Sequence, residues 1–331
     1  MLCPTPTPSP FPLSSAPVSA SPYLGQLAAL GTAVCWAFSA LAFAAAGRRM
    51  GVLPLNLIRL AMALGFLSLA AWGLRGVPLP VDASPRAWGW LAVSGLVGFV
   101  FGDLCLFQAY VLIGPRIASL MMSLAPLLTA LIGWLVLGET LTGRDALGMA
   151  LTVGGIGWAV LERHPQPPGE APAEPRSPPH SPPHKRPRAS LAGLALGFGG
   201  ALGQAGGLVL SKLGMGSYDA VAATQVRVIA GIAGYALLLL AVRRWRRVGQ
   251  AMGDRRALGF AAVGAFFGPF LGVSLSLFAV RYTVAGVAAS IMALQPVLVI
   301  PLVVLLHRER VGLGGIAGAL VAAAGVALLF L

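Results

Sequence analysis

The sequence predicts an all-α integral membrane protein with ten transmembrane helices, arranged as two five-helix repeats of inverted topology. Three observations support this fold class. The chain of 331 residues is 57% hydrophobic and only 10% charged, whereas a soluble domain has roughly 25% charged residues. Ten apolar segments come close to the ~20 residues that a helix needs to cross a bilayer. Several motifs of the first half return in the same order in the second half, about 170 residues later.

The apolar segments follow one another along the chain with a single long interruption. Residues 162–189 contain ten prolines and cannot bury a core, so they predict a linker. Residues 1–23 contain seven prolines and lack the basic start and apolar centre of a cleavable signal, so they predict a disordered tail. The expected repeats are therefore 24–161 and 190–331. The expected spans are 24–46, 54–75, 88–113, 117–138, 143–161, 190–211, 219–242, 257–280, 284–306 and 311–331.

The two expected repeats share a proline, a glutamate, a ladder of small residues and an arginine. The stretch "SLAPLLTALIGWLVLGET" at 123–140 returns as "ALQPVLVIPLVVLLHRER" at 293–310. Small-residue ladders let helix backbones approach closely in lipid. They are formed here by Ser94, Gly98 and Gly102 and, 170 residues later, by Gly264, Gly268 and Gly272. Because five is odd, the second repeat enters the membrane from the opposite side, as in many secondary transporters whose site lies between the repeats.

Pro126 and Pro296 are expected inside spanning helices, where each removes one N–H donor and frees carbonyl groups one turn back. In lipid those carbonyls need protein or a water-filled cavity. The two prolines therefore predict kinked helices that line a cavity, with a role in packing alone as the alternative. Glu139 and Glu309 mark where these helices leave the bilayer.

The stretch "LAPLLTALIGWLVLGETLTGRDALGMALTVGGIGWAVL" at 124–161, with its diverged copy at 294–331, resembles the EamA type of the drug/metabolite transporter superfamily. The proline, the "LGE" and the spaced glycines carry the resemblance, which extends over nearly the whole chain from about residue 24, apart from the linker. It implies a carrier with a central cavity that moves metabolites or amphipathic compounds, often outward. It does not name the substrate, because the superfamily is broad in what it carries.

Asp103 is the one acidic residue expected well inside a span. An ionised carboxylate there costs at least ~2.5–3.5 kcal/mol, so it is expected to face a cavity or a partner. Three roles are open: a structural ion pair with Arg59 or Arg227, the uptake and release of a coupling proton, or the binding of a cationic group of the substrate. Its counterpart in the second repeat is Val273, so its role is asymmetric.

Arg59 and Arg227 occupy matching places in the second span of each repeat. One interpretation is that both side chains snorkel to the headgroup region. The other is that two symmetry-related cations hold an anionic substrate or the carboxylate of Asp103.

The remaining candidates for a substrate cavity are polar or aromatic residues of the spans. Gln108 and Tyr110 follow the carboxylate of the third span on the same helix, and Gln295 adjoins a predicted kink. Trp36 and Ser123 complete the set. Their alternatives are aromatic packing and a hydrogen bond of the serine to its own helix backbone.

The sequence contains no phosphate-binding loop, nucleophile elbow, paired-carboxylate motif or zinc spacing, so neither an enzyme nor a cofactor is expected. Three scattered cysteines are too few for a disulfide framework or a metal site. The net charge of +13 lies mostly in short gaps between spans, which indicates membrane flanks rather than nucleic-acid binding. The expected partners are a small-molecule substrate and the lipid bilayer, and a homodimer stays open.

The leading hypothesis is a secondary active transporter of the cytoplasmic membrane that works by alternating access. It would export a small metabolite or amphipathic compound on a proton or substrate gradient, with import or exchange as alternatives. A non-transporting scaffold or sensor and an intramembrane enzyme are the alternatives of other classes. Odd-numbered connections contain 16 Lys and Arg and even-numbered ones five. The positive-inside rule thus places both termini outside, whereas the resemblance implies both inside.

Overall fold

The structure, a computed structural model, describes residues 23–161, 191–298 and 313–330. Every regular element in these ranges is a helix, which confirms the all-α prediction for them. Seven helices are long and apolar enough to cross a membrane, and two shorter apolar helices, Ala285–Leu298 and Gly314–Phe330, accompany them. The chain is therefore built as a multi-pass membrane protein, with seven spans by this measure against the ten expected; the ninth expected span extends beyond the described residues.

The helices follow the expected order, with two additions: a π-helix within each central span and a short helix after the seventh span. Those of the first half are α1 (Leu24–Met50), α2 (Val52–Arg75), α3 (Pro85–Gly95), the π-helix η1 (Leu96–Gly102), α4 (Asp103–Met122), α5 (Ala125–Leu137) and α6 (Gly143–Leu161). Those of the second half are α7 (Leu191–Met215), α8 (Ala220–Ala241), α9 (Trp245–Met252), α10 (Arg255–Ala265), the π-helix η2 (Phe266–Gly272), α11 (Val273–Tyr282), α12 (Ala285–Met292) and α14 (Leu313–Phe330).

The central helix of each half contains a π-helical segment of seven residues, η1 in the first and η2 in the second. The two segments begin 170 residues apart, as the glycine ladders do. Pro269 inside η2 gives a local cause, because proline cannot donate the N–H that an α-helix requires. π-Helical turns are often found at functional sites, and Asp103 is the first residue after η1.

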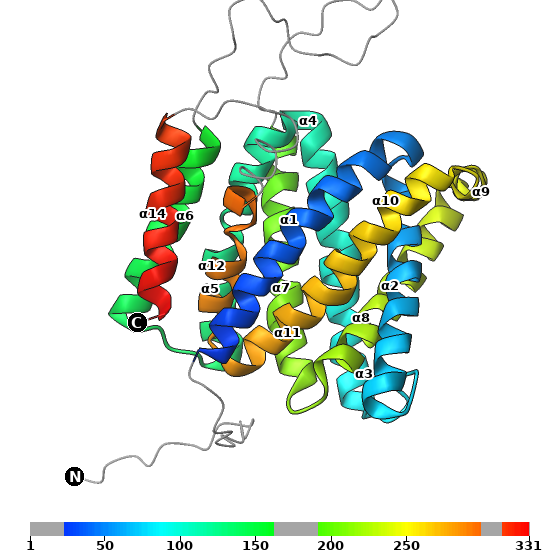
Figure 1. Cartoon of the computed structure of the whole chain (residues 1–331), viewed down its shortest axis with the longest axis horizontal. Coiled ribbons are helices and arrows are strands. Elements are labelled where there is room, and N and C mark those ends of the chain that lie inside the picture. Colours follow the sequence, from blue (N-terminus) through cyan, green and yellow to red (C-terminus); the bar gives the residue numbers. More distant parts are fainter. Residues whose placement is uncertain (1–22, 162–190, 299–312, 331) are drawn as a thin grey trace, which may run out of the picture.

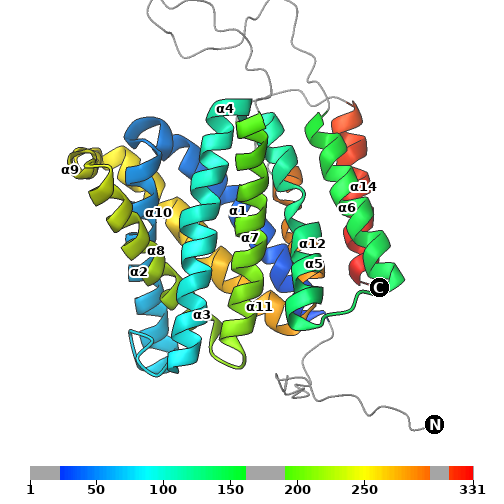
Figure 2. The same ribbon diagram turned by 180° about the vertical axis from the view of Figure 1, so that it is seen from behind.

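Each half packs its first helix against the central helix of the other half. α7 lies along α3, η1 and α4, while α1 lies along α10, η2 and α11 (Figures 1 and 2). α2 packs on α8, and α6 packs on α14 at one lateral side of the bundle (Figure 1). The core is therefore shared between the halves.

The glycine ladders lie where these helices cross, but the two ladders pack against different groups. A Cβ atom added to Gly203 of α7 would lie 2.6 Å from the Cα atom of Gly102, so the two backbones are in contact there. Opposite the second ladder, the space is occupied by the α1 side chains Phe43, Ser39 and Trp36. The first ladder thus brings two backbones together, and the second accommodates larger side chains.

α1 and α7 run in opposite directions. A Cβ atom on Gly25, at the start of α1, would lie 3.0 Å from the Cβ atom of Thr283. Lys212, in the last turn of α7, donates a hydrogen bond to the carbonyl oxygen of Thr283 at 2.6 Å. The start of α1 and the end of α7 therefore lie at the same end of the molecule (Figure 1).

The helix break near Pro126 differs from the expected kink. α4 continues through the predicted boundary at 114–116 to Met122, and Pro126 lies in the first turn of α5 rather than inside a helix. Because Pro126 has no N–H for the carbonyl of Met122, α4 ends there. Two tighter hydrogen bonds close it, from the N–H of Ser123 at 3.2 Å and of Leu124 at 3.1 Å. Before Pro296, α12 ends in the same way at Met292.

Candidate functional site

Arg59, Asp103 and Gln204 meet in the interior of the bundle. The Arg59 guanidinium donates a hydrogen bond to one carboxylate oxygen of Asp103 and forms an ion pair with it. The Gln204 side-chain amide donates to the other oxygen at 3.0 Å. These residues belong to α2, α4 and α7, so the centre contains side chains of both halves. The contact with Arg59 is the one that the first of the three roles left open for Asp103 requires.

This ion pair is not fully enclosed, despite its depth. Arg59 lies seven residues into α2, or roughly 10 Å along the helix at 1.5 Å per residue. The side chains of Arg59 and Asp103 are nevertheless 12% and 11% exposed. A charged pair at this depth is expected to border a hollow rather than lipid.

The side chain of Arg227 adds a second buried cation and forms no hydrogen bond within the described residues. It lies seven residues into α8 and is 5% exposed. Its guanidinium carbon is 4.9 Å from the centre of the Phe99 ring. Gly95 and Gly98 let Arg227 approach α3 and η1 closely. A Cβ atom on Gly95 would collide with the Arg227 carbonyl, and one on Gly98 would lie 3.3 Å from the Arg227 guanidinium. The small residues of α3 and η1 thus also allow α8 to pack closely.

Tyr235 of α8 fastens the π-helix next to this centre. Its hydroxyl donates to the carbonyl oxygen of Phe99 at 2.7 Å, and its side chain is fully buried. Where an α-helix passes into a π-helix, the backbone hydrogen bonds shift by one residue, which leaves a carbonyl without its usual donor, and a buried carbonyl needs a partner. Tyr235 therefore holds in place the turn that precedes Asp103.

Gln295 and Trp36 lie at the opposite crossing. The Gln295 amide donates to the carbonyl oxygen of Trp36 at 3.4 Å, which joins α1 to the helical residues after α12. Trp36 and Pro296 are half-buried. These residues are outside the hydrogen-bonded group around Asp103.

Among the described side chains of this region, Gln108, Ser123 and Pro126 take no part in the hydrogen bonds around Asp103. Gln108 is exposed, and Pro126 is buried. Ser123 donates to the carbonyl of Leu120 at 2.7 Å, the backbone role that was its alternative. The side chain of Tyr110, like all of Glu309, lies outside the described residues.

A second charged group, which the sequence did not predict, joins the halves at one end of the molecule. Glu139 forms an ion pair with Lys212 at the end of α7. Its other oxygen accepts a hydrogen bond from the N–H of Ala285 at 2.9 Å, at the start of α12. A carboxylate is favourable at a helix N-terminus. The single lysine of α7 was the available signal, but nothing near it in sequence indicated the partner.

Polar contacts outside the spans join the connections at the end of the molecule that contains Glu139 and Lys212. The hydrogen bond that Arg75 donates to Asp82 lowers the pKa of that carboxyl. Tyr218 donates to Asp82 at 2.8 Å. Burial and this hydrogen bond raise the pKa of Tyr218 to about 12.

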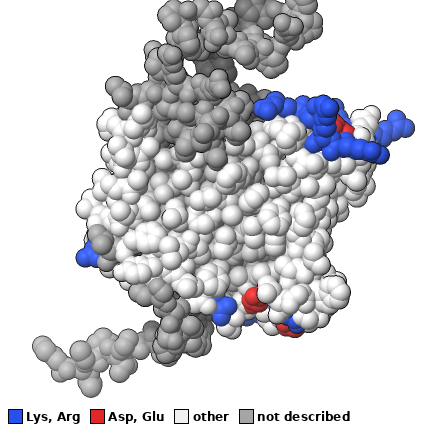
Figure 3. All heavy atoms as spheres, viewed as in Figure 1, with Lys and Arg blue, Asp and Glu red and all other residues white. Residues whose placement is uncertain are grey.

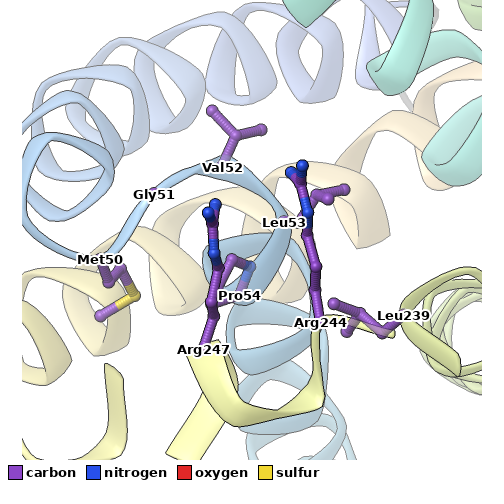
Figure 4. A pocket seen from close by; sticks show the side chains of 8 residues that line it. All are labelled: Met50, Gly51, Val52, Leu53, Pro54, Leu239, Arg244 and Arg247. Atoms are coloured by element: carbon purple, nitrogen blue, oxygen red, sulfur yellow. The ribbon is translucent and has the colours of Figure 1, made fainter. Parts of the chain in front are cut away.

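The opposite end is strongly basic. Arginines gather where α9 and α10 meet the ends of α1 and α8, and a broad uncharged band separates them from the other end on the face shown (Figure 3). Arg49 donates to Asp254 at 2.7 Å, which lowers the pKa of Asp254. A cavity of about 170 Å³ lies here, with the Arg244 and Arg247 side chains parallel beside the start of α2 (Figure 4). None of the sequence-predicted cavity residues lines it.

The described residues contain no group of three metal-ligating side chains that could hold an ion. Cys35 and Cys105, the two cysteines in the described ranges, are unpaired. The charged centre therefore consists of two arginines, one carboxylate and one amide, a set suited to binding polar groups and exchanging hydrogen bonds.

Comparison with known proteins agrees with this architecture. A model of the EamA-like transporter family matches residues 23–161 and 191–331. No match was found among curated proteins. Among matching chains of known structure, a crystal structure of a protein covers 92% of this chain and 95% of its own length, with a TM-score of 0.64 and 21% sequence identity. At that identity the likeness shows the fold alone.

Proposed function

This chain belongs to the EamA-like transporter family, and on that premise we propose that it is a secondary active transporter that works by alternating access. Its substrate is a small metabolite or an amphipathic compound. The observation that carries this proposal is the buried centre of Arg59, Asp103 and Gln204, which both halves build together. Carriers made of two repeats have their binding site at such a junction.

The proposed architecture is ten spans in two five-helix repeats of inverted topology, at 24–161 and 190–331, joined by a linker. Three features support it: the reciprocal packing of α1 and α7, their opposite directions, and the π-helices at matching positions. The pairs α2–α8 and α6–α14 contain matching helices of the two halves. A two-fold axis in the membrane plane would pair equivalent helices in this way.

In the proposed cycle, the contacts at Glu139 close one end of the carrier. They join α5 to α7 and α12, so two helices of the second half are held against one of the first. Opening towards that end requires these contacts to separate, while the centre around Asp103 stays near the middle. Uptake of a proton by Asp103 would weaken its pairing with Arg59 and couple the cycle to a proton gradient.

We place the protein in the cytoplasmic membrane, with the basic end facing the cytoplasm and transport directed outward. The arginines of α9 and α10 support this orientation through the positive-inside rule. The outward direction rests on the family resemblance.

The test begins with metabolite profiles, inside cells and in the medium, of a deletion strain and an overproducing strain. Compounds that change in opposite senses are then assayed with the full chain in proteoliposomes. We expect gradient-dependent flux for at least one compound, loss of that flux in Asp103→Asn, and normal flux in Asp145→Asn, whose carboxylate is outside the centre. Absence of gradient-dependent flux for every candidate compound would contradict the proposal.

A further inference from the structure

We propose that the substrate carries an anionic group, a carboxylate or a phosphate, which binds between the guanidinium groups of Arg227 and Arg59. This inference rests on the proposed transport function and narrows its substrate class. It starts from a charge imbalance in the interior of the bundle.

The interior of the described spans holds two cations for one anion. Arg59 is paired with the single carboxylate of Asp103, and Arg227 is buried against the ring of Phe99, in the π-helix that precedes Asp103. The other carboxylates of the described chain lie at helix ends or in connections; Glu139, for instance, is paired with Lys212. An uncompensated charge is expensive in a membrane interior. A ligand with one negative charge would make the centre neutral.

The unpaired hydrogen-bond donors indicate the same kind of ligand. The Nε atoms of Arg59 and Arg227 are both buried, and neither has an acceptor in the structure. Buried donors are nearly always paired, so each of these two arginines lacks one acceptor. A guanidinium matches the planar carboxylate and the phosphate geometrically, because several N–H groups of its fork can donate at once.

The described surroundings of Arg227 leave its charge uncompensated. Gly98 has no side chain, and the guanidinium lies directly against it. The faces of Phe99 and Phe43, which lie against Arg227 and Arg59 at 4.9 and 5.2 Å, stabilise the cations without neutralising them. The charge of Arg227 therefore stays available for an incoming anion, while Arg59 is shared with Asp103.

A cationic substrate group fits this centre less well. Each oxygen of Asp103 already accepts a hydrogen bond, one from Arg59 and the other from Gln204. An ammonium group would add a third positive charge beside this single carboxylate. An anion would instead offset the second arginine, which favours it over the cation-binding role.

The test measures ligand-dependent thermal stabilisation of the full chain in detergent, with inorganic phosphate, benzoate, benzamide and benzylammonium as probes. The background variant is Arg244→Gln/Arg247→Gln, which removes the surface arginines that would bind phosphate adventitiously. We expect saturable stabilisation by phosphate or benzoate, and none by the neutral or cationic probe. Arg227→Gln should weaken this binding at least about tenfold, since it removes charge-assisted hydrogen bonds.

If Arg227→Gln does not fold, Arg227→Lys replaces it; this variant keeps the charge but loses the fork, so weaker binding is again expected. No saturable effect of either anion, or an effect that survives both Arg227 variants, overturns the inference. Transport assays separate this result from the proposed function. Flux of a neutral or cationic compound without anion binding leaves a transporter of another substrate class, and anion binding without any flux refutes transport alone.

Discussion

Breaking the Arg59–Asp103 pair from either side should destabilise the protein almost as much as removing both charged groups together. Asp103→Asn leaves Arg59 and Arg227 without a carboxylate. Arg59→Gln leaves a buried carboxylate with Gln204 as its one described hydrogen-bond partner. Removal of one partner from a buried ion pair costs about 3–5 kcal/mol. Because both side chains are only about a tenth exposed, we expect roughly 3 kcal/mol from each single change.

The double variant Asp103→Asn/Arg59→Gln replaces the ion pair with a neutral amide pair, so it should lose little more than either single variant. The coupling energy of the cycle is then about 2–3 kcal/mol. It can be measured by equilibrium unfolding in mixed detergent micelles. The control cycle is Arg75 with Asp82, a more exposed pair, for which we expect a much smaller coupling.

A coupling energy near zero at Arg59 and Asp103 would refute this reasoning, because the two side chains would then act independently. Transport distinguishes the structural role from proton coupling. If Asp103 also carries the coupling proton, Asp103→Asn abolishes gradient-driven flux and leaves part of the substrate exchange. If the pair is only structural, both fluxes fall together with the amount of folded protein.

Three further predictions concern packing, the closed end and pH. Gly203→Ala should lower the free energy of unfolding by about 1–3 kcal/mol, since its Cβ atom would meet the Gly102 backbone. The control Gly65→Ala, with open space around it, should be neutral or stabilising by up to ~1 kcal/mol. Unfolding of both variants in detergent compares the two free energies. Glu139→Gln removes the ion pair with Lys212 and should increase the labelling of cysteines placed inside that end. The folded pKa of Asp82 lies below its usual 3.8, so the contribution of its carboxylate to stability is present above pH 3.8 and is lost as the pH falls through the folded pKa. The stability advantage of the wild type over Asp82→Asn should therefore vanish in thermal unfolding at acid pH.

Composition and periodicity were sufficient to predict the helical membrane architecture, because a long apolar helix is the simplest way to satisfy a backbone in lipid. They also singled out Asp103 and its two possible arginine partners. The choice between Arg59 and Arg227 depends on which side chain reaches the carboxylate after the helices have packed, and sequence spacing does not determine that.

Two features lay beyond sequence reasoning for physical reasons. The ion pair of Glu139 and Lys212 joins residues 73 positions apart at the meeting point of three helices, so no local pattern indicates it. The π-helices depend on a shift in backbone hydrogen bonding that packing stabilises, as the bond from Tyr235 to Phe99 shows. Pro126 was expected to kink a helix; it begins one, because the chain breaks before it rather than at it.

The sidedness of two connections tests the central claim, that two halves of opposite orientation enclose the charged centre. Single cysteines would replace Val52, after α1, and Ser217, after α7, both exposed, in a background with Cys3, Cys35 and Cys105 changed to alanine. A membrane-impermeant thiol reagent should label Val52→Cys and Ser217→Cys from opposite faces of the membrane, and Leu79→Cys from the same face as Ser217→Cys. Labelling of the Val52 and Ser217 positions from one face would contradict the account.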